Sequence, residues 1–203
     1  MEFYRRAAKS PFRLGVFPGS FNPFTVAHLE LARAALRTVD EVVYILPRVF
    51  PHKHYRDTTL EQRVDLLRTA VAGEPQFSIA AAAGGLFIEI ARECRAAYGP
   101  GIHLSFLCGR DAAERIAGWD YGRPGAWQEM LREFDLLVAP RAGEYAPDPP
   151  QLGSFAQIEV DPACQNISAS EVRRRIASGE PWEEMVPKAI RAKVREFYTG
   201  KTG

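Results

Sequence analysis

The stretch over residues 14–28, LGVFPGSFNPFTVAH, constrains the fold more than any other part of the chain. It begins with an apolar run over 14–17 that predicts a buried strand, and it continues through a Gly/Ser/Asn/Pro turn. It ends in the first turn of a predicted helix whose apolar residues keep the spacing of one helical face: Val26, Leu29, Ala32, Leu36 and Val39. Because the turn and the first helical turn expose backbone N–H groups, this order of elements favours an anion-binding site.

Two polar side chains stand where that helix begins. Thr25 has the position of an N-cap residue, which makes His28 the third helical residue, on the same helix face. There His28 would lie beside a phosphate held by the helix end. The glycine spacing matches neither the G-x-G-x-x-G dinucleotide fingerprint nor the Walker loop. An ordinary turn followed by a capping or surface histidine is the alternative interpretation.

A second segment with similar chemistry lies near the C-terminus, over 167–175, with the sequence ISASEVRRR. Ser168 with Glu171 fits a capping box, so a helix is predicted to begin here. Three arginines then follow close to the helix N-terminus, where the helix dipole disfavours cations. A bound polyphosphate would reverse that cost, because it would meet serine hydroxyls, helix N–H groups and a guanidinium together.

Both segments resemble the signatures of the nucleotidyltransferase superfamily with a His/Thr-x-Gly-His motif. This superfamily includes nicotinate and nicotinamide mononucleotide adenylyltransferases, pantetheine-phosphate adenylyltransferase and cytidylyltransferases, and the first of these branches is the most similar. The first signature is carried by Gly19, Ser20, Phe21, Asn22, Pro23, Thr25 and His28, with Ala27 where the motif usually has glycine. The second, Ile-Ser-x-Ser/Thr-x-x-Arg, is carried by Ile167, Ser168, Ser170 and Arg173. Arg174 and Arg175 are expected to face other partners or solvent.

The rest of the chain predicts alternating strands and helices. Predicted strands cover 41–47, 77–81, 102–108, 135–140 and 155–160; predicted helices cover 59–72, 86–98, 126–134 and 187–198. Strand–helix–strand order indicates a parallel sheet with right-handed crossovers. Together with the resemblance, it predicts an α/β fold: a Rossmann-like doubly wound parallel sheet in a single domain with C-terminal helices. We assign 1–12 to an N-terminal extension and 13–203 to the nucleotidyltransferase domain.

Ligands of such sheets bind at the carboxyl ends of the strands, so the loops there supply further candidates. Lys53 follows the strand over 41–47 in a Pro-His-Lys run that resembles the nicotinate branch, and it is a candidate phosphate contact. Gly109 and Asp111 follow the strand over 102–108. Asp111 would either bind a ribose hydroxyl or cap the next helix.

Acceptor recognition is expected from two further positions. By the resemblance, Trp119 would stack on the pyridine ring of the acceptor, with Trp127 as the competing candidate and core packing as the alternative for either. Arg141 follows the strand over 135–140 in an Arg-Ala-Gly run similar to the Arg-Pro-Gly of relatives. Where the nicotinate enzymes usually have a Tyr-Thr-rich segment, this chain has Gly84 and Gly85.

The resemblance implies adenylyl transfer from ATP to nicotinate or nicotinamide mononucleotide in NAD biosynthesis, with release of pyrophosphate. The implied catalytic residues are His28, Thr25, Lys53 and Arg173. The implied ATP contacts are Gly19, Ser20, Phe21, His28, Gly109, Asp111, Ile167, Ser168, Ser170 and Arg173. The implied acceptor contacts are Asn22, Lys53, Trp119 and Arg141. Mg²⁺ would be held mainly by the ATP phosphates, without a dedicated set of protein ligands. Transfer to another phosphorylated acceptor, or nucleotide binding without catalysis, are the alternatives.

Length, charge and composition indicate what kind of protein would carry out this chemistry. The chain has 203 residues, enough for one α/β domain, and a formal net charge of +1 that gives no reason to expect nucleic-acid binding. The first ten residues are polar, and no stretch has the length and apolar character of a membrane span, so we expect a cytoplasmic protein without a membrane partner. Cys94, Cys108 and Cys164 are scattered and are expected to be reduced thiols. A homo-oligomer is compatible with the sequence.

Overall fold

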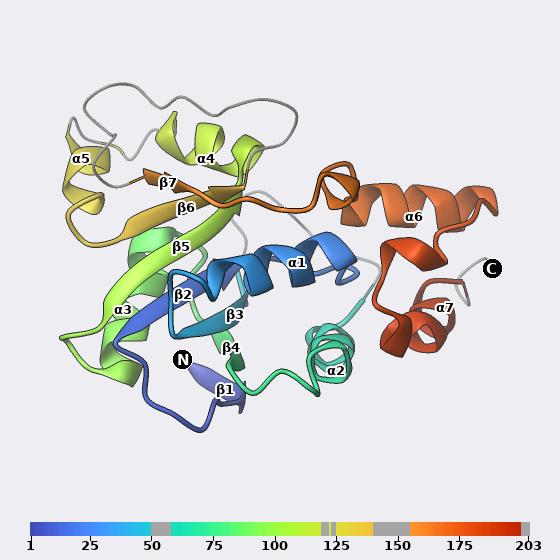
Figure 1. Cartoon of the computed structure of the whole chain (residues 1–203), viewed down its shortest axis with the longest axis horizontal. Coiled ribbons are helices and arrows are strands. Elements are labelled where there is room, and N and C mark those ends of the chain that lie inside the picture. Colours follow the sequence, from blue (N-terminus) through green and yellow to red (C-terminus); the bar gives the residue numbers. More distant parts are fainter. Residues whose placement is uncertain (50–57, 119–121, 123–124, 140–154, 200–203) are drawn as a thin grey trace.

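The computed structural model describes residues 1–49, 58–118, 122, 125–139 and 155–199, and this part of the chain builds a 7-stranded sheet with helices on both faces (Figure 1). The strands are β1 (Glu2–Arg5), β2 (Arg13–Pro18), β3 (Glu41–Pro47), β4 (Phe77–Ala82), β5 (His103–Gly109), β6 (Asp135–Ala139) and β7 (Phe155–Gln157). The α-helices are α1 (Val26–Ala35), α2 (Leu60–Ala70), α3 (Phe87–Tyr98), α4 (Arg110–Ala117), α5 (Ala126–Met130), α6 (Ala169–Ser178) and α7 (Arg191–Thr199). Short 3₁₀ helices are η2 (Pro162–Cys164), η3 (Glu183–Met185) and η4 (Lys188–Ile190).

The strand order is β1-β4-β3-β2-β5-β6-β7, and it confirms the predicted doubly wound α/β sheet. Strands β2 to β7 pair in parallel, and β1 alone runs antiparallel, at the edge beside β4. From β2 the chain first winds outward through β3 and β4, then returns to place β5 on the other side of β2. The carboxyl ends of β2 and β5 therefore form the topological switch point, where ligands of open α/β sheets bind.

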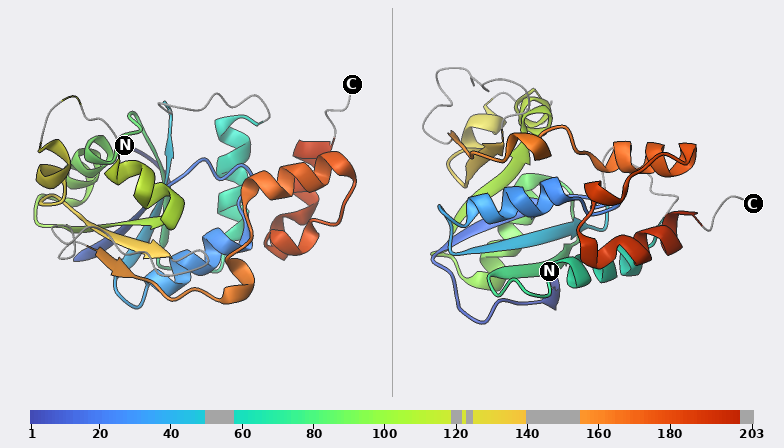
Figure 2. Two further views of the ribbon diagram at one scale, coloured as in Figure 1. Left: turned by 90° about the horizontal axis from the view of Figure 1, so that it is seen from above. Right: turned by 45° about the vertical axis from the view of Figure 1, so that its right-hand side comes forward.

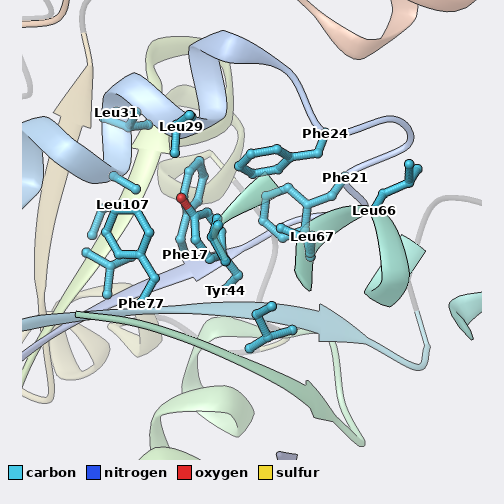
Figure 3. Packing of buried hydrophobic residues seen from close by; sticks show 14 of the residues in the cluster. Phe17, Phe21, Phe24, Leu29, Leu31, Tyr44, Leu66, Leu67, Phe77 and Leu107 are labelled. Carbon is cyan, nitrogen blue, oxygen red and sulfur yellow. The ribbon is translucent and has the colours of Figure 1, made fainter. Parts of the chain in front are cut away.

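Two apolar layers hold the sheet between the helices. Along β3, alternate residues face opposite layers: Tyr44 packs toward α1 and α2, whereas Val43 packs toward α3. In the first layer the rings of Phe17, Phe21 and Phe24 gather around Tyr44 below α1, as Figure 3 shows. This aromatic cluster connects the strand end of β2 to the start of α1, and so it fixes the loop between them.

Three elements differ most in extent from the prediction. Helix α5 ends at Met130 instead of 134, because the chain turns there and carries Phe134 into the core. Strand β7 ends at Gln157 instead of 160, and a few residues later Asp161 caps η2 by accepting a hydrogen bond from the Ala163 amide at 2.9 Å. The closing helix begins only at Arg191, after the 3₁₀ turn η4.

Residues at the N-terminus add to the sheet. Within the extension assigned to 1–12, Glu2–Arg5 forms β1, which pairs with β4. The amino group of Met1 lies 3.1 Å from a carboxylate oxygen of Glu93 on α3, and the Arg6 guanidinium stacks over the rings of Phe3 and Tyr98. Because Glu2 pairs with Ala81, the first residues of β1 lie beside the carboxyl end of β4.

Among the described residues, we find no helix long and apolar enough to cross a bilayer. Cys94, Cys108 and Cys164 are all free. Burial raises the pKa of the Cys94 and Cys108 thiols to about 12, so these two groups are almost wholly protonated near neutral pH.

Candidate functional site

The loop between β2 and α1 delivers His28 in one defined orientation. Thr25 is the N-cap of α1, as predicted, and His28 is its third residue. The two residues cap each other: the Thr25 amide donates to His28 Nδ1 at 3.0 Å, and the His28 amide donates to Thr25 Oγ1 at 3.4 Å. Because a backbone N–H can only donate, Nδ1 must be an acceptor, and the proton of the neutral imidazole is on Nε2. His28 therefore presents a hydrogen-bond donor through Nε2.

Aromatic rings fix the plane of that imidazole. Phe24 stacks on it at 5.6 Å between ring centroids, and Phe21 and Phe17 meet it edge-on at 5.2 Å and 5.9 Å. Figure 3 shows how these phenyl rings come from the strand and from the loop to one place. A catalytic donor is effective when its orientation is set before the substrate arrives, and the capping pair and the three rings together provide this.

Gly19 and Phe21 shape the tight part of the loop. Phe21 has a φ of 48°, in the left-handed region, and its side chain is only 1% exposed. A β-carbon on Gly19 would lie 2.8 Å from the Phe21 ring, so only glycine fits there. The Gly19 amide donates to the Ile45 carbonyl at 3.0 Å. Phe21 is thus a core residue, and its backbone alone is placed to contact a ligand.

Sequence reasoning missed one further residue, Arg63 on α2. This arginine is buried, and its Nη1 donates to the Ser20 carbonyl at 3.0 Å. Its position between Leu60 and Leu67 on the inner face of α2 was the available signal, because an arginine on an apolar face must find a partner. Arg63 therefore stabilises the loop between β2 and α1 through the Ser20 carbonyl.

The second predicted segment arrives at the same loop. Ser168 is the N-cap of α6, and its Oγ accepts from the Glu171 amide at 3.1 Å. From the next turn, Arg173 Nη1 donates to the backbone carbonyl of Asn22, and Nη2 donates to Ser170 Oγ at 3.3 Å. In Figure 1 the first turn of α6 lies beside the first turn of α1, and the views in Figure 2 agree. The two motifs, 151 residues apart at Asn22 and Arg173, thus converge.

The capping box predicted for Glu171 is only half formed. The Glu171 carboxylate turns away from the N-cap and pairs with Arg174 at 2.7 Å and Arg175 at 2.8 Å. These two guanidiniums, Arg174 first, lower the pKa of Glu171 to about 2. Arg174 also pairs with Glu180 at 2.6 Å, so both later arginines face other partners, as predicted. Of the three arginines, Arg173 is the one that contacts the described part of the β2–α1 loop.

Asn22 makes structural contacts within the protein. Its side chain is 2% exposed, and Oδ1 accepts hydrogen bonds from Thr58 Oγ1 at 2.9 Å and from the Tyr198 hydroxyl. The acceptor contact expected of Asn22 stays a prediction. Burial and two hydroxyl donors make Asn22 a structural link, and a bound mononucleotide would have to displace both donors to reach Oδ1.

The carboxyl end of β5 offers open backbone at the switch point. Gly109 is the N-cap of α4, with a φ of −80° that any residue adopts, and a β-carbon there would meet no atom of the described residues within 4 Å. Asp111 is the second residue of α4, so the alternative that it caps this helix is wrong. Neither backbone strain nor packing requires a glycine at 109, which leaves the close approach of a ligand as a reason for it.

Several predicted residues lie outside the described part of the chain, namely Lys53, Trp119 and Arg141. Trp127, the competing candidate for stacking, is buried in the layer between the sheet and α3, and so core packing describes it. Over the described residues, no group of three or more His, Cys, Asp or Glu side chains is arranged to hold a metal ion.

Comparison with known proteins gives matches over the same two motifs. The cytidylyltransferase-like family model matches residues 16–175, which include both His28 and Arg173. The chain is 29% identical to a protein of Citrifermentans bemidjiense named "Probable nicotinate-nucleotide adenylyltransferase", over 91% of this chain and 96% of that protein. A protein of the same name from Chromobacterium violaceum is 27% identical, over 90% of this chain and 96% of its own length.

Solved structures share the fold at lower sequence identity. The Plasmodium falciparum nicotinic acid mononucleotide adenylyltransferase complexed with NaAD has a TM-score of 0.68 and 16% identity, covering 91% of this chain and 95% of that one. The same enzyme complexed with APC has a TM-score of 0.68 and 15% identity.

Proposed function

Given that the chain belongs to the cytidylyltransferase-like family, we propose that it transfers the adenylyl group of ATP to nicotinate mononucleotide. The phosphate oxygen of the acceptor attacks the α-phosphorus in line, the bond from that phosphorus to the bridging oxygen breaks, and pyrophosphate leaves with the electron pair. The products are the dinucleotide and pyrophosphate. The names of the curated relatives, nicotinate-nucleotide adenylyltransferases, support this choice of acceptor.

One observation carries the proposal: Arg173 of α6 donates to the carbonyl of Asn22, in the loop that precedes α1. It brings two helix N-termini, each with unsatisfied N–H groups and a partial positive charge, to one place. Transfer of a phosphoryl or adenylyl group requires positioning and charge neutralisation more than covalent help from the protein. Two helix starts joined by this contact, with the His28 donor on one and the Arg173 guanidinium on the other, would supply both.

His28 and Arg173 bind different phosphates of ATP. His28 Nε2 donates to a non-bridging oxygen of the α-phosphate, where negative charge grows in the transition state. Thr25, buried and occupied in capping His28, acts chiefly by fixing that imidazole. Arg173, with the Ser170 hydroxyl and the N–H groups at the start of α6, holds the β- and γ-phosphates. Ser168 and Ile167 keep that helix start in place.

The position of the switch point and the resemblance to the family indicate the remaining contacts with ATP and the acceptor. Ser20 and Gly19 offer loop backbone to the ATP phosphates, and Gly109 with Asp111 lies where a ribose would pass the end of β5. Lys53 would assist the phosphates, and Trp119 and Arg141 would bind the acceptor. Mg²⁺ enters as part of the MgATP substrate, bridging its phosphates.

The deciding experiment measures pyrophosphate release from MgATP with nicotinate mononucleotide and nicotinamide mononucleotide side by side, and with CTP in place of ATP. We expect the fastest release with ATP and nicotinate mononucleotide. Release only with a different phosphorylated acceptor would overturn the acceptor assignment. Binding of ATP without pyrophosphate release for any acceptor would overturn catalysis itself and favour a nucleotide-binding relative.

Gly109→Ala tests whether the open backbone at the end of β5 receives a nucleotide. The added methyl meets no protein atom within 4 Å, so the melting temperature should stay close to that of the wild type. The KM for ATP should rise roughly tenfold, about 1.4 kcal/mol, because the methyl would occupy space needed by the ligand. Steady-state kinetics at saturating acceptor measures this.

Gly101→Ala is the matched control for that substitution. Gly101 precedes the other end of β5, and a β-carbon there also meets nothing within 4 Å. Its KM for ATP should equal that of the wild type. Equal KM values for both variants would show that Gly109 makes no close contact with the nucleotide.

A further inference from the structure

Three segments that are distant in sequence donate hydrogen bonds to Asn22, in the loop between β2 and α1. Its side-chain Oδ1 accepts from Thr58 Oγ1, in the residue pair that precedes α2, and from the Tyr198 hydroxyl of α7. Its backbone carbonyl accepts from Arg173 of α6. An amide oxygen has two lone pairs, so these two hydroxyls fill the capacity of Oδ1. The orientation of the carboxamide is thereby fixed from two sides.

The last helix supplies one of those hydroxyls from a fixed base. Lys193 Nζ donates to both carboxylate oxygens of Asp65 at 2.7 Å and to Thr69 Oγ1 at 2.9 Å, which ties α7 to α2. Val194 is fully buried in the layer shared with α1 and α2. These contacts hold α7 in place independently of the Tyr198 hydroxyl. Removing that hydroxyl should therefore alter the hydrogen bonding of Asn22 and leave the position of α7 unchanged.

We propose that Tyr198 is a positioning residue of the nucleotide site: its hydroxyl holds Asn22, and Asn22 in turn holds Arg173 in line with the start of α1. The inference rests on the proposed function, because it assumes that Arg173 meets the polyphosphate. If the Asn22 side chain is free to turn, its peptide plane and the carbonyl that orients Arg173 are less constrained. The guanidinium then spends less time in the position that binds phosphate, and ATP binds more weakly.

Tyr198→Phe removes the hydroxyl and keeps the ring. We expect the Kd for a non-hydrolysable ATP analogue, measured by calorimetry, to rise about tenfold, equivalent to about 1.4 kcal/mol. In the enzymatic assay the KM for ATP should rise similarly, while kcat at saturating ATP should change less than twofold. A loss confined to kcat would overturn the proposal, because His28 and not Arg173 would then have been disturbed.

Tyr98→Phe is a matched control for mere destabilisation. The Tyr98 hydroxyl also donates to a buried oxygen, Glu41 Oε1, at 2.5 Å, and Glu41 is 2% exposed, as is Asn22. This pair lies where β3 begins, at the edge of that strand opposite the site. Both variants should lower the melting temperature, and only Tyr198→Phe should weaken ATP binding. Equal effects of both on ATP binding would overturn the inference.

A substitution of Asn22 tests the route from Tyr198 to Arg173. Asn22→Leu removes the acceptor, so adding Tyr198→Phe to it should cause no further loss of ATP affinity. Independent, additive losses would show that Tyr198 acts by another route.

A readout without any ligand separates this inference from the proposed function. The side-chain ¹⁵N resonances of Arg173, assigned by their disappearance in Arg173→Lys, should shift in Tyr198→Phe and stay unchanged in Tyr98→Phe. Unchanged Arg173 resonances in Tyr198→Phe would refute the positioning role whatever the enzyme assay shows. Shifted resonances in a protein that releases no pyrophosphate would retain the contact and refute only the enzymatic proposal.

Discussion

His28→Asn is expected to lower kcat by about 10²–10³-fold, the effect of removing one oxyanion-stabilising donor, with almost no loss of stability. Asparagine places Oδ1 the same number of bonds from the backbone as the Nδ1 of histidine, so it can still accept from the Thr25 amide. It has no group at the position of Nε2. The substitution therefore deletes the donor to the α-phosphate and keeps the cap of α1.

Two further variants make the result specific. His28→Ala should lose the same factor in kcat and, in addition, about 1 kcal/mol of stability, because the N-cap amide then lacks its acceptor. His28→Gln, whose side-chain N–H₂ extends toward the position of Nε2, should recover part of the lost kcat. Pre-steady-state pyrophosphate release and thermal melts measure the two effects separately. Near-normal turnover in His28→Asn would mean that another group stabilises the transition state.

The helix starts could be predicted because an N-cap depends on only a few neighbouring residues. Thr25 at α1, Thr59 at α2 and Ser168 at α6 are the N-caps that the sequence predicts. An N-cap needs only a hydroxyl at one position and a donor two or three residues later, so a short window of sequence decides it. The same logic failed for the side chain of Glu171, where two arginines on the following turn compete for its carboxylate more strongly than the N-cap amide.

The convergence of the two motifs could be expected only through the resemblance. Nothing within either segment specifies that Arg173 reaches the carbonyl of Asn22, because a backbone acceptor leaves no trace in the sequence. The family match over both motifs confirms the resemblance on which that expectation depended. Hydrogen bonds between side chains and distant backbone carbonyls are decided by packing, and packing is known only once the fold is known.

Residues that support the site from behind were missed for the same reason. Arg63 and Tyr198 contact Ser20 and Asn22 from helices that the sequence describes simply as amphipathic. Asn22 holds a motif position for which the sequence predicts an acceptor contact, and the structure adds a supporting role, because its buried side chain accepts from Thr58 and Tyr198. A motif thus identifies which residues matter at a site more reliably than it identifies what each of them touches.

Arg173→Lys is expected to lower kcat/KM for ATP by about 10²-fold, or about 2.7 kcal/mol of transition-state stabilisation. In the structure one guanidinium spans two partners, donating from Nη1 to the Asn22 carbonyl and from Nη2 to Ser170 Oγ. A lysine ammonium is a single point of charge on a flexible chain, and it loses the fixed fork that such a position requires. Keeping the positive charge makes this variant a test of geometry instead of net charge.

The neighbouring arginine provides the control for this substitution, one residue along the same helix. Arg174 is exposed and paired with Glu171 and Glu180, away from the β2–α1 loop, so Arg174→Lys should change kcat/KM for ATP less than threefold, since exposed ion pairs contribute about 0–1 kcal/mol. Steady-state kinetics with ATP varied at saturating acceptor distinguishes the two variants, and raising the salt concentration should weaken ATP binding in both by the same factor. Equal losses in Arg173→Lys and Arg174→Lys would mean that the second motif acts through its overall charge. That result would remove the reason for placing the polyphosphate between the starts of α1 and α6, because among the described residues it is Arg173 that connects the two.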